Sequence, residues 1–80
     1  MKYIIVEDQT TGLEHAILFP SIDIMSHKEL ARRIPLKTTS AGFVTIIKDK
    51  AHTYGESISL NMKPRQEDAR IIDELLGENP

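Results

Sequence analysis

Four basic side chains lie close together in the middle of the chain and are the strongest candidates for a binding site. Lys28, Arg32 and Arg33 belong to one short predicted helix, and Lys37 follows in the segment after it. Lys28 and Arg32 are four residues apart, which places them one turn apart on the same helix face. Such cations bind phosphate groups, so the sequence identifies a candidate polyanion-binding site. The alternative interpretation is that they stay solvated and complement the helix dipole.

The charge distribution limits how a polyanion could bind. The net charge of the 80 residues is -2, and the acidic side chains gather in residues 1–24 and from residue 64 onward. The molecule as a whole would repel a polyanion, so any contact must be local. The chain's aromatic residues, which single-strand binders use to stack bases, are expected mostly in the core.

The histidines and hydroxyl groups do not form a recognisable metal-binding or catalytic pattern. His15, His27 and His52 are far apart in sequence and lack the spacing of paired metal ligands, and the chain has no cysteine. Ser57 follows Gly55-Glu56, but no glycine comes two residues after it, so it lacks the pattern of an activated nucleophile. The glycines are isolated, which argues against a phosphate-binding loop. We therefore expect a protein that is not an enzyme and has no cofactor and no metal site.

The sequence predicts that the elements which position these side chains follow the order strand, strand, helix, strand, strand, helix. The first two strands, Lys2–Glu7 and Leu13–Phe19, form a predicted hairpin with Gly12 in its turn. Ser26 and Glu29 match a capping box, so a helix is expected from Ser26 to just before Pro35.

The second half of the chain is predicted in the same way. After a polar loop over 37–41, a third strand covers 42–48 and a turn at Asp49-Lys50 leads into a fourth strand over 51–62. Gly55 interrupts that strand as a bulge, which leaves open whether Thr53 or Tyr54 faces the core. Alternation within 57–62 places Ile58, with every second residue after it, on the core face. A helix follows, in which apolar residues recur up to a C-cap at Gly77.

Three blocks of residues carry a resemblance to known proteins. Ser40–Phe43, Tyr54–Leu60 and Arg65–Ile72 resemble blocks in small uncharacterised proteins encoded by tailed bacteriophages and prophages. The resemblance covers mainly residues 40–76. It implies a phage or prophage origin and an accessory protein that binds a host or phage macromolecule, and it assigns no functional residue.

Three predicted strands are apolar on both faces, within residues 3–6, 16–19 and 43–47. We expect one α+β domain over 1–80, in two layers: a mainly antiparallel four-stranded sheet with both helices on one face. The other face then needs a cover, either a second copy, a different protein, or the chain's own connections over 20–25 and 35–41.

These observations predict a small accessory protein that acts by macromolecular binding. The partner is expected to be a protein or a second copy in a homodimer. A nucleic-acid-binding module that uses the basic helix is the alternative. No apolar run approaches the roughly 20 residues that span a bilayer, and the first residues do not resemble a signal peptide. We therefore expect no membrane partner and a cytoplasmic location in a bacterial host.

Overall fold

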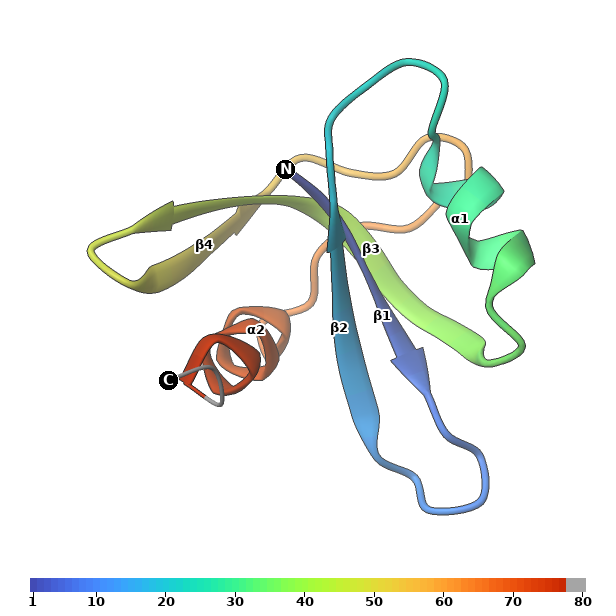
Figure 1. Ribbon diagram of the computed structural model, residues 1–80, viewed down its shortest axis with the longest axis horizontal. Coiled ribbons are helices and arrows are strands. Elements are labelled where there is room, and N and C mark those ends of the chain that lie inside the picture. The colour runs from blue at the N-terminus through green and yellow to red at the C-terminus, as the bar shows by residue number, and fades with distance from the viewer. Residues whose placement is uncertain (78–80) are drawn as a thin grey trace.

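Four strands form one antiparallel sheet in the computed structural model, which describes residues 1–77 (Figure 1). The strands are β1 (Lys2–Glu7), β2 (Glu14–Phe19), β3 (Lys37–Ile47) and β4 (Lys50–Tyr54), in the spatial order β2-β1-β3-β4. Helix α1 (His27–Arg33) follows β2, and helix α2 (Asp68–Gly77) follows β4. The predicted α+β fold and its element order are confirmed.

The two helices lie on opposite faces of the sheet, which corrects the predicted two-layer arrangement. Alternate residues of β1 point to opposite sides. Tyr3 and Ile5 belong to a buried cluster with Ile72 of α2, whereas Ile4 and Val6 belong to a second cluster, against which α1 packs. Figure 1 shows α1 and α2 well apart, with the sheet between them. The apolar residues on both faces of β1 are therefore covered by the chain itself, and they do not require a partner.

Local signals place α1 where the sequence predicted it. The backbone N–H of Glu29 donates to the Ser26 hydroxyl at 3.1 Å, so Ser26 caps the helix. The helix ends at Arg33, and Ile34 is already extended ahead of Pro35. In the β1–β2 connection, Gly12 adopts a φ of 76°, as its turn position requires.

The β3–β4 hairpin differs from the prediction in two places. Residues 37–41, expected as a loop, form the first part of β3 and pair with β1. The register shifts between Ile5 and Val6, so Thr39 is the extra residue of a β-bulge. The turn falls at Lys48 and Asp49, which have φ values of 51° and 64°; two left-handed residues in a two-residue turn match the twist of the strands that they join.

The predicted strand over 51–62 is wrong beyond Tyr54. Gly55 has a φ of 69° and turns the chain out of β4. The following residues close a small loop through a bridge between Ser57 and Met62. In that loop Ser57 is buried and Ile58 is 88% exposed, the reverse of the prediction for these two residues, whereas Leu60 and Met62 pack against the core as predicted. The Ser57 hydroxyl accepts a hydrogen bond from the backbone N–H of Leu60, which explains why the polar residue points inward.

The second helix begins after an irregular segment that contains Pro64. Its residue Ile72 is fully buried against the sheet, as the apolar spacing predicted. Gly77 ends α2, but its φ is not in the left-handed region, so the predicted C-cap conformation is absent.

Candidate functional site

A buried carboxylate joins three distant parts of the chain. Asp68, at the first residue of α2, is completely buried. It accepts hydrogen bonds from the Tyr3 hydroxyl at 2.7 Å and from the Ser40 hydroxyl at 2.8 Å. The backbone N–H and the Nε of Arg65 donate to the same carboxylate, each at 3.0 Å. The carboxylate therefore attaches the start of α2 to β1 and β3.

Arg65 extends this cluster to the sheet edge. Its Nη2 atom lies 3.0 Å from the Asp68 carboxylate and 2.9 Å from the Glu14 carboxylate on β2. Thr39, the bulged residue of β3, donates to Glu14, and this hydrogen bond, with the nearby Arg65, lowers the pKa of Glu14. Burial and the hydrogen bond to Asp68 raise the pKa of Tyr3 far above its usual range. The cluster holds fixed charges in place and binds the helix to the sheet.

The strongest candidate for a binding surface is the side of the β3–β4 hairpin that faces away from α2. It carries three cross-strand pairs, which we call the hairpin face: Phe43 with Tyr54, Thr45 with His52, and Ile47 with Lys50. The neighbouring residues Val44, Ile46 and Ala51 point to the opposite side and join the α2 cluster. In Figure 1 this hairpin extends away from α1, so neither helix covers the hairpin face.

Large apolar side chains are exposed on the hairpin face. Ile47 is 50% exposed and Tyr54 is 51% exposed. The rings of Phe43 and Tyr54 are stacked, with centroids 5.6 Å apart and an interplanar angle of 27°. Stacking fixes the orientation of the tyrosine ring and leaves half of its surface in water. A rigid aromatic side chain with little entropy to lose is a typical anchor of a protein interface.

A loop at the β4 end of the hairpin face enlarges the exposed apolar surface. Gly55 lies against the Phe43 ring, so close that an added Cβ would be 2.9 Å from it. Beyond this contact, Glu56 and Ile58 line an open hollow of about 240 Å³ together with Lys2, His27, Phe43 and Ser59. Ile58 therefore lies at the rim of a hollow that continues from the hairpin face.

His27 forms part of this hollow from the α1 side. Its Nε2 lies 2.7 Å from the carbonyl oxygen of Gly42, and its ring packs edge-on between Phe19 and Phe43. Burial lowers the pKa of His27, with a smaller contribution in the same direction from the charge of Lys2. Its neutral ring therefore supports the aromatic residues beneath the hollow.

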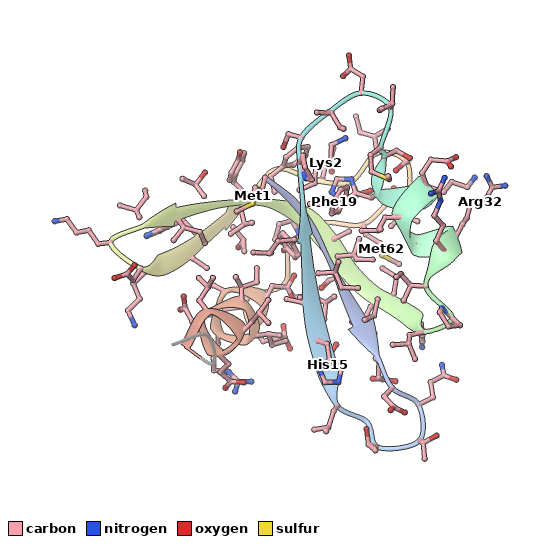
Figure 2. All side chains as sticks on the ribbon, in the orientation of Figure 1. Met1, Lys2, His15, Phe19, Arg32 and Met62 are labelled. Carbon is pink, nitrogen blue, oxygen red and sulfur yellow. The ribbon has the colours of Figure 1, made fainter. Side chains whose placement is uncertain are left out.

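The predicted basic site lies on the other side of the molecule from the hairpin tip. Lys28, Arg32, Arg33 and Lys37 are all exposed, and Figure 2 shows Arg32 pointing outward from α1. The Nη1 of Arg32 lies 3.4 Å from the Glu29 carboxylate. Lys37 stands at the start of β3, opposite Glu7 of β1. Acidic groups therefore interrupt the line of cations.

The remaining sequence candidates are dispersed. His15 is exposed on β2 and His52 on β4, whereas His27 is buried at the first residue of α1. Among residues 1–77, no three His, Cys, Asp or Glu side chains gather closely enough to hold a metal ion. Ser57 is buried within its own loop.

The sequence indicated that residues 43–47 are apolar on both faces, but it did not identify the hairpin face. The pairing of Phe43 with Tyr54 depends on the β3–β4 register, and the turn that sets this register lies at Lys48 and Asp49, one residue before its predicted position. Within the part of the chain that the structure describes, no helix is long and apolar enough to cross a membrane. Comparison of the chain with protein-family models, with curated proteins and with solved structures finds no match.

Proposed function

We propose that this chain is a small accessory protein that acts by binding another protein chain through the hairpin face. The observation that carries the proposal is the exposure of Ile47 and Tyr54 on the hairpin face and of Ile58 in the loop that follows it, while apolar residues elsewhere on the sheet pack against α1 and α2. Exposed apolar side chains that lie near one another are typical of interaction sites.

The chemistry of the hairpin face favours a protein partner. Phe43 and Tyr54 lie at one end of the hairpin face and Ile47 at the other, with Thr45 and His52 between them, and Lys50 and Glu56 add charges near the turn and in the loop beyond β4. Aromatic residues are enriched in protein interfaces. The two charges have opposite signs, so the surface presents no basic track for a nucleic-acid backbone.

Site-specific photocrosslinking tests this proposal. A photoreactive amino acid replaces Ile47 on the hairpin face, and in a matched control it replaces Arg70, which is exposed on α2. We expect a defined protein adduct from position 47 in cells that express the chain, none from position 70, and loss of the adduct when Tyr54→Ser is added. Equal labelling from both positions, or no protein adduct from position 47, would refute the proposal.

The nucleic-acid alternative depends on different residues and is tested separately. Lys28, Arg32, Arg33 and Lys37 are all accessible, so a phosphate backbone could reach them. For this alternative, a labelled single-stranded or duplex oligonucleotide should bind at low salt, and Arg32→Ala with Arg33→Ala should weaken binding and flatten its salt dependence. Absence of binding at low salt removes this alternative and leaves the hairpin-face proposal unaffected.

A further inference from the structure

Within residues 1–77, the outer edge of β2 has no neighbouring strand. β2 comes first in the spatial order of the sheet and pairs with β1 on its inner side. The backbone N–H of Asp8 donates to the carbonyl oxygen of Leu13 at 2.9 Å, and hydrogen-bonded pairs recur at every second residue of an antiparallel ladder. The odd-numbered residues of β2 therefore bond to β1. The even-numbered residues direct their backbone N–H and C=O groups away from the sheet: Glu14, Ala16 and Leu18.

The opposite edge of the sheet, at β4, is protected. The backbone N–H of Ala51 donates to the Asp73 carboxylate at 2.8 Å, so α2 already satisfies one group on this edge. β4 has five residues, and it begins with Lys50 after two left-handed residues. Short strands, lysines and irregular backbone all hinder pairing with another chain. β2 has six residues and contains neither lysine nor proline, so it is the edge at which another strand can pair.

The edge of β2 matches a second copy of itself. When two antiparallel β2 strands are related by a two-fold axis at Ile17, this residue lies opposite its own copy, and Ala16 lies opposite Leu18. Ala16 and Leu18 belong to the cluster on the α2 side, and Ile17 packs on the α1 side. Apolar side chains therefore meet on both sides of the sheet, and such cross-strand pairs are stabilising. Glu14 lies opposite Pro20, so no like charges stand directly opposite each other.

A hollow beside this edge gives the second copy a further contact. Ala16 of β2 and the partly buried Ile71 and Leu75 of α2 line a hollow of about 70 Å³, together with polar residues at its margin. In the pairing described above, Leu18 of the second copy lies directly opposite Ala16. Its side chain would extend the apolar cluster beneath α2 across the contact.

We infer that two copies of this chain associate through their β2 edges into one continuous antiparallel sheet. The backbone groups of Ala16 and Leu18 supply the new hydrogen bonds, and the apolar pairs set the register. The two-fold axis closes the assembly as a dimer, because each copy uses its β2 edge and the protected β4 edges lie at the two ends. The hairpin face lies at the β4 end, so this contact is separate from the proposed function and goes beyond it.

Backbone hydrogen exchange measures this contact residue by residue. A pairing of two short strands is smaller than a standard stable interface, so the concentration series must reach the millimolar range. The N–H groups of Ala16 and Leu18 should exchange quickly in dilute protein and several-fold more slowly as the concentration rises. The N–H groups of His15 and Ile17 bond to β1 and should be protected at every concentration. Sedimentation equilibrium over the same series gives the dissociation constant.

A proline substitution at each edge tests the contact by mutation. Ala16→Pro removes an N–H group that points outward and leaves the ladder with β1 intact. Because the bond from this group forms twice in the dimer, we expect the dissociation constant to rise about thirtyfold. Thr53→Pro is the matched control, since Thr53 lies two residues after Ala51 on β4 and its N–H group also points outward. It should leave the dissociation constant unchanged. Circular dichroism checks that both variants are folded, and the exchange measurement on the wild-type chain needs no variant.

The outcomes distinguish this dimer from other contacts. A chain that stays monomeric over the whole series, or equal weakening by Ala16→Pro and Thr53→Pro, overturns it. Association that slows exchange on the hairpin face but leaves Ala16 and Leu18 unchanged also overturns it. If Ala16 and Leu18 become protected only when other proteins are added, the edge pairs with a foreign strand and the second copy is refuted. None of these results alters the photocrosslinking expected from position 47, so the two proposals fail separately.

Discussion

Replacing Asp68 with alanine should cost this protein a large part of its stability. The substitution removes a fully buried carboxylate that accepts hydrogen bonds from the Tyr3 hydroxyl, the Ser40 hydroxyl and two groups of Arg65. The two buried hydroxyls lose their acceptor, at about 1 to 3 kcal/mol each. The arginine also loses one of its two main carboxylate partners. We expect the free energy of unfolding to fall by about 3 to 5 kcal/mol, the range for breaking a buried ion pair.

Urea-induced unfolding followed by far-ultraviolet circular dichroism measures this loss. Asp73→Ala is the matched control, because Asp73 also lies on α2 and accepts a hydrogen bond from the backbone N–H of Ala51 at 2.8 Å. The control should cost about 1 kcal/mol. If Asp68→Ala is too unstable to measure, Tyr3→Phe removes only one of the four hydrogen bonds and should cost about 1 to 2 kcal/mol. Equal losses in Asp68→Ala and Asp73→Ala would refute the structural role of the cluster.

Three further predictions concern packing, capping and pH. Gly42→Ala should destabilise the fold by about 1 to 3 kcal/mol, because the new Cβ would lie 2.6 Å from a ring carbon of the proline that precedes α2. Ser26→Ala should cost about 1 kcal/mol, since it removes the cap of α1; thermal unfolding measures both changes. The free energy of unfolding should also decrease as the pH falls below the ordinary histidine value of 6.5, because the folded state lowers the pKa of His27 and the unfolded chain takes up the proton first.

The packing and pH predictions can each be checked with a second variant. Gly12→Ala introduces a Cβ into open space, so only its positive φ costs energy, about 1 kcal/mol, and a loss at Gly42 no larger than this would contradict the packing argument. His27→Gln should reduce the dependence of the free energy of unfolding on pH around the ordinary histidine value of 6.5. If the free energy of unfolding of His27→Gln depended on pH as strongly as that of the wild-type protein, a group other than His27 would be responsible.

Sequence reasoning succeeded where the signal was local. The Ser26 cap, the stop before Pro35 and the turn at Gly12 act through residues within a few positions, and the structure has all three. It failed at Ser57 and Ile58, which belong to a hydrogen-bonded loop and not to a strand, although Leu60 and Met62 pack against the core as expected. Burial of Ser57 depends on its bond to the Leu60 N–H, which no periodicity reveals.

The positions of the helices could not be obtained from the sequence for a different reason. Apolar residues on both faces of β1 correctly indicated that two covers are needed, but the length of the connections does not determine which face each helix takes. For α2, the face is determined by the hydrogen bonds that join Asp68 to residues 3, 40 and 65. Of the candidate sites, the basic residues were visible directly, whereas the hairpin face required the register that pairs Phe43 with Tyr54.

Because β1 lies inside the sheet, its apolar side chains can be buried only after later parts of the chain have been synthesised. β1 is synthesised before β3 but needs β3 as its second neighbour, so its apolar side chains stay exposed until residues 37–43 have emerged from the ribosome. The anchor of α2 is synthesised later still, at Asp68. A product truncated before α2 would expose Tyr3, Ile5 and Val44 to chaperones and proteases, and quality control in the cell should remove it.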